Sequence, residues 1–420
     1  MRAGGEKSGT SHTPVRDLSS ISKELTHVKR RGATYFDSAS WQLEARLRVN
    51  NKLLSCLVLT GIAAMPAHAQ DIVIGQSVAL TGTNADIGRD MRDGALAVFA
   101  QANASNLLGS GRKIQLVTLD NANSRQRAAE NTQQLLGKFG AVALFGYNSA
   151  TNSLDALPLA AQTDTLFFAP FSGADALRSI PQAYTIRASY QDEARKIIEA
   201  KREVGADKAV VLYYDDEIGH GNFDAVIAAF AAAGAPKPTG LAVKRGARLD
   251  GGTVTALMKD SPHFVLVTTQ FGTVSDLLRA ASVTGTQMSI AALSFVNPDE
   301  LSESSGDLAR GVVVSQTMPS PRRSNQVSIP VVKDCADLLA AYSGAKLNYT
   351  SLESCIAAKT LVIALKRAGP KATRGAILHA MGSLSRVDLG GYTLNFSPTN
   401  HNGSNWVELT ILARGNRYMQ

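Results

Sequence analysis

The sequence has 420 residues, of which 45% are hydrophobic and 19% charged, which is typical of a folded chain with more than one domain and excludes a largely disordered one. Its formal net charge of +8 is distributed unevenly, because residues 1–69 contain ten Lys and Arg against five Asp and Glu. Residues 70–420 are left with 33 basic and 30 acidic side chains, so the charge does not indicate nucleic-acid binding.

A secretory signal peptide is predicted over residues 49–69. Basic side chains precede an apolar run from Leu53 to Met65, and the small-x-small cleavage signal Ala67–His68–Ala69 follows it. The run is too short to span a bilayer as a membrane anchor. We therefore expect cleavage after Ala69 and export to the periplasm of a chain that begins at Gln70.

Residues 1–48 are polar, irregular and much longer than the basic segment that usually begins a signal peptide. We expect translation to start near Val49, a residue that a GTG start codon encodes, which would make residues 1–48 non-native. The alternative is a genuine, disordered extension.

Strands and helices alternate from Gln70 onward, which is typical of βαβ units and a parallel sheet with helices on both faces. The expected strands of the first block are Asp71–Leu80, Lys113–Leu119, Ala141–Phe145, Thr165–Ala169 and Ala183–Arg187. The expected helices between them are Ile87–Asn103, Ser124–Phe139 and Ala150–Gln162.

The same pattern occurs a second time after Tyr190. The expected strands are Ala209–Tyr214, Gly240–Lys244, Phe264–Thr268, Ser289–Leu293 and Gly311–Gln316. The expected helices are Gln191–Val204, Asn222–Ala233, Thr253–Lys259 and Phe271–Val283. The sequence thus predicts two α/β lobes.

Met318–Pro319–Ser320–Pro321 interrupts this pattern. Beyond it we expect helices and then strands, at Val331–Tyr342, Ser351–Ala368, Thr373–Met381, Tyr392–Phe396 and Trp406–Ala413. This order suggests that the chain returns to each lobe, with a cleft between the two. We assign residues 70–189 and 318–395 to lobe 1, and residues 190–317 and 396–420 to lobe 2, with hinges near Ser189, Met318 and Asn395.

Polar residues follow two expected strands, Ala141–Phe145 and Thr165–Ala169. Ser149 and Thr151 lie in the first loop, where Ser149 can cap the next helix, and Phe171–Ser172–Gly173 forms the second loop. Open α/β sheets bind ligands at the carboxyl ends of their strands, so we expect a binding site here. Hydroxyls, backbone donors and helix N-termini favour an anion such as a carboxylate. The alternative is that both loops are ordinary turns.

Other loops contribute aromatic residues, namely Tyr190, Phe271 and Phe295. Aromatic side chains together with a few hydroxyls suit the capture of a small molecule.

No motif indicates an enzyme, because the sequence lacks a GxSxG elbow, a P-loop and a GxGxxG turn after a strand. Asp215–Asp216–Glu217 at a strand end is typical of a solvated loop. The Cys and His residues lack metal-ligand spacing. We therefore expect no catalytic residue, no metal and no cofactor.

Cys335 and Cys355 both lie in apolar helical stretches. They can pair in the oxidising periplasm, and two buried free thiols are an equal alternative. Cys56 lies within the apolar run of the signal peptide rather than after it, which disfavours a lipoprotein.

A family resemblance covers almost all of the chain from Gln70 to about Ala413. It rests on DIVIGQSVALTG, IQLVTLDNAN, FGYNSATNS, FFAPFSGADALR, YTIRASYQDE, VLYYDDEIG, GVVVSQTMPSP and LGGYTLNFSPTNHNGS. With these motifs in this order, the chain resembles the periplasmic solute-binding proteins of branched-chain amino-acid ABC transporters, the leucine/isoleucine/valine-binding family. The resemblance implies a periplasmic-binding-protein type I fold, in which two lobes, joined by three hinge crossings, close around the ligand.

The resemblance also implies roles for individual residues. The carboxylate-binding serine of the family falls on Ser149, with Thr151 close by. The loop that binds carboxylate and ammonium falls on Phe171–Gly173, where Gly173 takes the place of a threonine and Ser172 is adjacent. The aromatic wall of the first lobe falls on Ile87.

Two positions of the second lobe follow in the same way. An aromatic position falls on Gln270 or Phe271. The acidic residue that pairs with the ligand's ammonium falls on Ser294 or Phe295, and neither is acidic. A buried ammonium without a carboxylate costs several kcal/mol. This departure favours a ligand such as an aromatic acid, an amide or urea.

The sequence therefore predicts an exported binding component of an ABC transporter that captures a small carboxylate-bearing solute. The expected solute is a branched-chain amino acid or a related aromatic or aliphatic acid or amide, and the expected partners are this solute and an inner-membrane permease. A monomer is the family expectation. A periplasmic ligand sensor or regulator of the same fold is the alternative, and a periplasmic enzyme is disfavoured.

Overall fold

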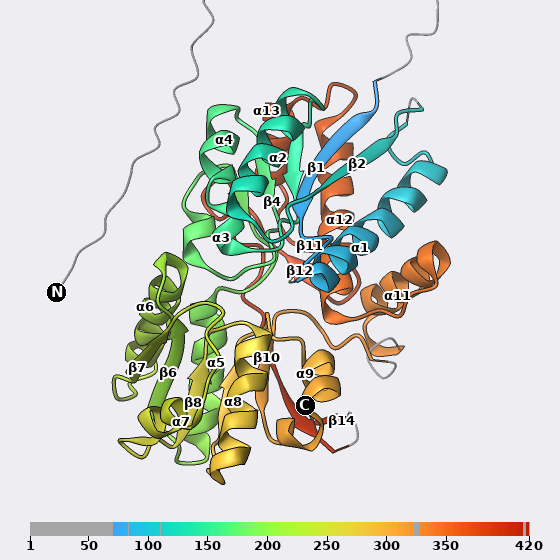
Figure 1. Ribbon diagram of the computed structural model, residues 1–420. Helices are drawn as coiled ribbons and strands as arrows, with labels where there is room; N and C mark the ends of the chain where they lie inside the picture. The colour runs from blue at the N-terminus through green and yellow to red at the C-terminus, as the bar shows by residue number, and fades with distance from the viewer. Residues whose placement is uncertain (1–69, 83, 110, 323–326, 415–416, 420) are drawn as a thin grey trace, which may run out of the picture. The chain divides into compact units, whose positions relative to one another are not determined.

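The structure is a computed structural model that describes residues 70–82, 84–109, 111–322, 327–414 and 417–419 (Figure 1). All of them belong to the unit Pro66–Gln420. The predicted signal peptide, its cleavage site and the extension before it lie outside the described residues.

The first lobe is built on a five-stranded parallel sheet with the strand order β2-β1-β3-β4-β5. Its strands are β1 (Ile72–Val78), β2 (Ile114–Asp120), β3 (Ala143–Phe145), β4 (Leu166–Phe168) and β5 (Ala183–Tyr184). The helices between them are α1 (Ala85–Ala104), α2 (Arg125–Gly137), α3 (Ala150–Ser153), α4 (Ala156–Gln162) and the 3-10 helix η1 (Asp175–Arg178). The predicted order of elements in this block is confirmed.

Alternate residues of β1 and β3 point to opposite faces of this sheet, and each face is buried by helices. Ile74 and Phe145 pack with α1 on one face, whereas Leu144 packs with α2 and α4 on the other. Because both faces of the sheet are buried, successive residues of these strands are apolar, among them leucine, isoleucine and phenylalanine.

The second lobe is built on a seven-stranded sheet with the order β14-β13-β10-β9-β8-β6-β7. Its parallel strands are β6 (Ala209–Tyr214), β7 (Thr239–Val243), β8 (Phe264–Val267), β9 (Ile290–Ala292) and β10 (Val313–Gln316). The strands β13 (Glu408–Ala413) and β14 (Arg417–Met419) extend it in antiparallel fashion.

Helices cover both faces of the second sheet as well (Figure 1). On one face lie α5 (Tyr190–Glu203) and α6 (Glu217–Ala232), and on the other lie α7 (Gly251–Met258), α8 (Phe271–Thr284), α9 (Pro298–Ser305) and the 3-10 helix η2 (Gly306–Ala309). The sequence reading did not predict α9, η2 or β14. Asn297 caps α9 and Pro298 occupies its first turn, which is a recognised signal for the start of a helix.

After β10 the chain returns to the first lobe. The helices α11 (Pro330–Ser343), α12 (Tyr349–Ala368) and α13 (Arg374–Gly382) pack on its sheet, together with the hairpin of β11 (Val387–Asp388) and β12 (Thr393–Leu394). Within the described residues, no helix is both long and apolar enough to cross a membrane.

The third crossing lies later in the chain than the expected hinge at Asn395. Phe396 is buried in the first-lobe core against Tyr184, at 5.6 Å between ring centroids. Gly403 N donates a hydrogen bond to Thr185 O, and Trp406 packs on the same core. The chain therefore enters the second sheet only at β13, and the other expected boundaries stay predictions.

Cys335 of α11 and Cys355 of α12 form a disulfide, with the two Cα atoms 6.0 Å apart. This settles the alternative that the sequence left open between a pair and two free thiols. The bond joins two helices of the first lobe and closes a loop between residues 20 positions apart.

Candidate ligand-binding site

A cavity of about 450 Å³ is lined by residues of both lobes. Its first-lobe lining comes from the loops after β1, β3 and β4, and its second-lobe lining comes mainly from the loops after β6, β7, β8 and β9 and from the helices that follow them. These loops leave the carboxyl ends of parallel strands, as the sequence predicts. The volume suits a ligand of a few to some tens of atoms.

Ser149 and its neighbour Asn148 present polar groups on the first-lobe side of the cavity. The Ser149 hydroxyl caps α3 and accepts a 3.4 Å hydrogen bond from Asn152 N. Asn148 is only 5% exposed, and its Oδ1 accepts a hydrogen bond from Ala79 N. Its Nδ2 has no hydrogen-bond partner among the described residues. This side of the cavity therefore offers a hydroxyl and an uncommitted amide donor.

The loop after β4 combines a ring and a hydroxyl. Phe171 N donates to Tyr147 O at 2.8 Å, which holds the two loops together. The Ser172 hydroxyl lies 3.2 Å from the Tyr190 hydroxyl and accepts a hydrogen bond from Ala174 N. Phe171, Ser172 and Tyr190 all line the cavity.

Gly173, which the sequence analysis places in the ligand site, is not among the residues that line the cavity, and its contact with a ligand stays a prediction. Its carbonyl accepts a hydrogen bond from Tyr190 N at 3.0 Å. A Cβ atom at this position would lie 2.6 Å from the Tyr190 ring. The close approach of this backbone to Tyr190 leaves no room for a larger side chain at position 173.

The second lobe contributes mostly aromatic surface. Phe271 begins α8, and Phe295 follows β9 with its ring centroid 5.5 Å from that of Tyr190, edge to face. Tyr214 lines the same side, and its hydroxyl lies 2.9 Å from the Thr273 hydroxyl. This contact between the two rings joins the loop after β9 to the start of α5.

Ser294, one of the two positions expected to face a ligand ammonium, does not line this cavity. Its side chain is buried among Arg187 and Glu193 behind the cavity. Only Phe295 of that pair lies on the lining.

Charged residues that the sequence reading missed also line the cavity. Arg245 lies over the Tyr214 ring at 4.0 Å and pairs with Asp216, and Arg279 pairs with Asp276. Asp86 and Glu300 are carboxylates from different lobes.

The carboxyl of Glu300 is half-buried in α9 and makes no ion pair or hydrogen bond within the part of the chain that the structure describes. Burial raises its pKa, and the nearby charges of Asp86 and Asp90 raise it further. Glu300 was not predicted as a site residue, because the helix α9 that contains it was not predicted from the sequence.

All but one of the predicted site residues line the same cavity. The residues on the lining are Ser149, Thr151, Phe171, Ser172, Tyr190, Phe271 and Phe295, whereas Gly173 is not part of it. Ile87 and Gln270 also lie on the lining. Their roles in binding stay predictions. Among the described residues, no group of three or more His, Cys, Asp or Glu side chains is placed to hold a metal ion.

Two α/β lobes with a cavity between their sheets define the class of two-lobed binding proteins. The sequence model described as periplasmic binding protein matches residues 71–413, and the chain belongs to this family. The expectation of a binding protein rather than an enzyme agrees with that membership. A comparison with curated proteins gave no match.

Three solved structures with this fold illustrate the range of its relatives. A possible leucine/isoleucine/valine-binding protein from Rhodopirellula baltica SH 1 is 28% identical, with a TM-score of 0.78 over 85% of this chain and 98% of that one. A substrate-binding periplasmic protein from Ralstonia solanacearum is 26% identical, with a TM-score of 0.75 over 83% and 100%. A fatty acid ABC transporter substrate-binding protein from Thermomonospora curvata, at 17% identity, a TM-score of 0.72 and coverage of 83% and 90%, shares the fold alone.

Proposed function

We propose that the chain is the exported substrate-binding component of an ABC transporter and captures a small carboxylate-bearing solute for an inner-membrane permease. The expected solute is a branched-chain amino acid or a related aromatic or aliphatic acid or amide. The observation that carries this proposal is the cavity itself, which is lined by both lobes and holds hydroxyl and amide donors beside aromatic rings. The descriptions of the relatives support a transport role.

The carboxylate end of the solute is assigned to the first lobe. Ser149 and Thr151 supply hydroxyls, and Asn148 Nδ2 supplies a donor without a partner among the described residues. A buried donor that gains an anionic acceptor makes a charge-assisted hydrogen bond, which contributes about 1.5–3 kcal/mol.

The remainder of the solute is assigned to the aromatic surface of Phe171, Tyr190, Phe271 and Phe295. Flat or branched apolar groups bury their surface against such rings. A solute that also carries an ammonium group would meet Asp86 and Glu300, which line the same cavity from the two lobes.

Binding of the solute to both lobes favours their closed arrangement, because the solute contacts the second lobe only when the two lobes approach. We further propose that the protein is a periplasmic monomer released by cleavage after Ala69. These features follow the family and the signal-peptide pattern.

Thermal unfolding of the full chain with a panel of solutes tests the proposal. The panel contains leucine, valine, glutamate, benzoate, acetamide and urea. A bound solute at 100 times its dissociation constant adds about 2.7 kcal/mol to the free energy of unfolding, so the unfolding midpoint rises by several degrees. We expect such a rise with at least one carboxylate of the panel.

The pattern of shifts separates the solute classes. A rise in the unfolding midpoint with leucine or valine, but not with benzoate, would place an ammonium group at Asp86 and Glu300. Glu300→Gln should then reduce this rise. A shift with benzoate alone would support an acid without an ammonium group. Shifts confined to acetamide or urea, or absent throughout, would contradict the carboxylate assignment.

A further inference from the structure

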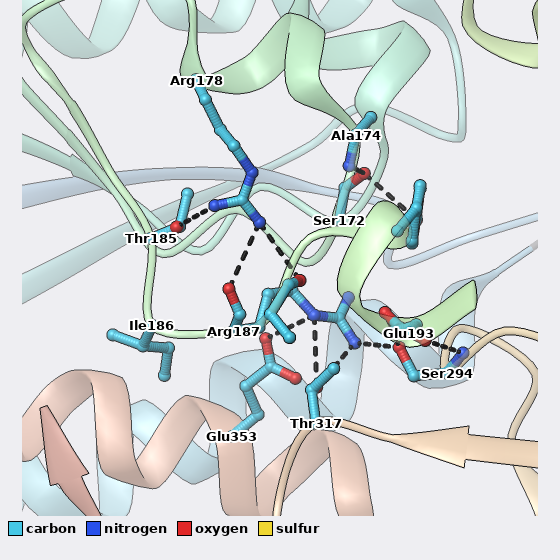
Figure 2. A network of polar contacts seen from close by, with 12 residues as sticks. Ser172, Ala174, Arg178, Thr185, Ile186, Arg187, Glu193, Ser294, Thr317 and Glu353 are labelled. Atoms are coloured by element: carbon cyan, nitrogen blue, oxygen red, sulfur yellow. Dashed lines mark hydrogen bonds and ion pairs between the residues drawn. The ribbon is translucent and has the colours of Figure 1, made fainter. Parts of the chain in front are cut away.

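A buried arginine, Arg187, lies at the centre of a network of polar contacts that Figure 2 shows. Arg187 follows β5 and precedes α5, and it is 1% exposed. Its Nη2 donates hydrogen bonds to Ser294 Oγ at 2.7 Å and to Thr317 Oγ1 at 3.2 Å. Its Nε lies 3.4 Å from Oε1 of Glu353, an ion pair without hydrogen-bond geometry. The guanidinium therefore contacts the second lobe at Ser294, the second crossing at Thr317 and the first-lobe helix α12 at Glu353.

Ser294 connects this guanidinium to a second carboxylate. Its hydroxyl accepts from Arg187 and donates to Glu193 Oε1 at 2.9 Å, and its N–H donates to Glu193 Oε2 at 2.7 Å. Ser315 Oγ also donates to Glu193 Oε2. Glu193 accepts all three of these hydrogen bonds, as an ionised carboxylate does. The serine hydroxyl thus has both of its hydrogen bonds committed to the charged network.

The same guanidinium also contacts the cavity lining from behind. Its Cζ lies 4.5 Å from the centroid of the Phe171 ring, in cation–π geometry. Its second-lobe partner Ser294 immediately precedes Phe295, which lines the same cavity. The Arg187 guanidinium therefore contacts Phe171, an aromatic lining residue of the first lobe. It also contacts Ser294, the chain neighbour of an aromatic lining residue of the second lobe.

Arg187 does not line the main cavity, so it is not placed to touch a solute there. The space beside it, lined also by Gln316, Thr317 and Glu353, measures about 10 Å³. Such a space holds at most one water molecule and excludes a carboxylate. Any effect of Arg187 on solute binding must act through Phe171 and the Ser294–Phe295 segment.

We propose that Arg187 is a positioning residue that holds the Phe171 loop and the Ser294–Phe295 loop in one mutual arrangement. A buried charge that loses one partner cannot be re-solvated cheaply, so removal of a contact on one side disturbs the other side. The inference rests on the proposed function only where it concerns solute affinity. The coupling between the loops stands without a solute.

Hydrogen exchange of the full chain without solute, followed by mass spectrometry, tests this coupling. Ser294→Ala removes the hydroxyl in the second lobe and leaves Arg187 in place. We expect about tenfold faster exchange in the first-lobe peptide around Phe171 and Ala174, whose amides are hydrogen-bonded in the native structure. Ser305→Ala is the matched control, because this buried second-lobe hydroxyl contacts Ser275 and not Arg187. It should leave that peptide unchanged.

A conservative pair of variants separates positioning from a general loss of packing. Thr317→Val keeps the shape of the side chain and removes the oxygen that accepts from Arg187, whereas Thr317→Ser keeps the oxygen. The valine variant should accelerate exchange in both loops, and the serine variant should restore the slow exchange of the wild type.

Each outcome bears on the proposal. If Ser294→Ala changes only its own peptide, or if Thr317→Val and Thr317→Ser behave alike, Arg187 does not couple the loops. If the loops are coupled and a panel solute binds, Ser294→Ala should weaken its affinity about tenfold. If the loops are coupled but no solute of the panel binds, the result supports the role of Arg187 and contradicts the proposed function.

Discussion

At the scale of single residues, Glu353 differs from the other members of the buried network. Glu193 accepts three hydrogen bonds, whereas Glu353 makes only its ion pair with Arg187 among the described residues. Burial raises the pKa of Glu353 to about 7, an effect opposed by Arg187 and increased by Glu193. Tyr392 on the adjoining segment is the other titratable group that faces it. Glu353 therefore takes up a proton on folding near neutral pH.

The pH dependence of stability follows from this pKa. In the unfolded chain Glu353 ionises near its ordinary value of 4.5, so between this value and about 7 the folded state binds more protons. Its contribution to the free energy of unfolding therefore falls as pH rises through this window and is constant above it. Urea unfolding at pH 5 and pH 8 measures the effect. We expect Glu353→Gln to gain stability relative to the wild type on going from pH 5 to pH 8.

Glu199→Gln is the control, because Glu199 is an exposed carboxylate on α5. The difference in free energy of unfolding between Glu199→Gln and the wild type should be the same at pH 5 and at pH 8. An equally constant difference for Glu353→Gln would contradict the assignment of a raised pKa to Glu353.

Individual site residues could be predicted from the sequence only where local pattern determines their position. Ser149 caps a helix after a strand, and both features can be recognised locally. Asp86, Arg245 and Glu300 reach the cavity because distant elements fold around it. No local pattern distinguishes them from solvated charges, which is why the sequence reading missed them.

At the scale of elements, long periodic segments were predicted well, whereas the short helix α9 was not predicted. The helix expected at Ile87–Asn103 is α1, Ala85–Ala104, because its apolar residues recur at helical spacing over five turns. By contrast, α9 has only eight residues, a serine-rich end and few apolar positions. Its cap and first-turn proline were the available signal.

The disulfide between α11 and α12 is the element-scale feature with the clearest energetic effect. Closing a loop of about 20 residues limits the unfolded chain and stabilises the fold by about 3 kcal/mol. Reduction with dithiothreitol should lower the free energy of urea unfolding by about this amount. The variant with both Cys335→Ala and Cys355→Ala should be insensitive to the reductant. Equal stability of the oxidised and reduced wild type would contradict a stabilising role.

At the scale of the whole molecule, the repeat of the βα pattern predicts two lobes but not which lobe receives each later segment. The residues from Phe396 to Trp406 illustrate the limit, because nothing local shows that they pack on the first lobe. Their contacts with Tyr184 and Thr185 join positions more than 200 residues apart in the sequence. The paired crossings near Arg187 and Thr317 are joined by Tyr392, whose single hydroxyl proton is shared between Ile186 O at 3.0 Å and Thr317 O at 3.1 Å.

We propose that a carboxylate solute binds between the lobes and favours their closed arrangement. Small-angle X-ray scattering of the full chain, recorded before and after each panel solute is added, tests it most directly. We predict that a carboxylate which raises the unfolding midpoint also decreases the radius of gyration, while solutes without a thermal effect leave it unchanged. A carboxylate that stabilises the protein with no change in the radius of gyration, or a panel without effect on either quantity, would show that no carboxylate closes the two lobes.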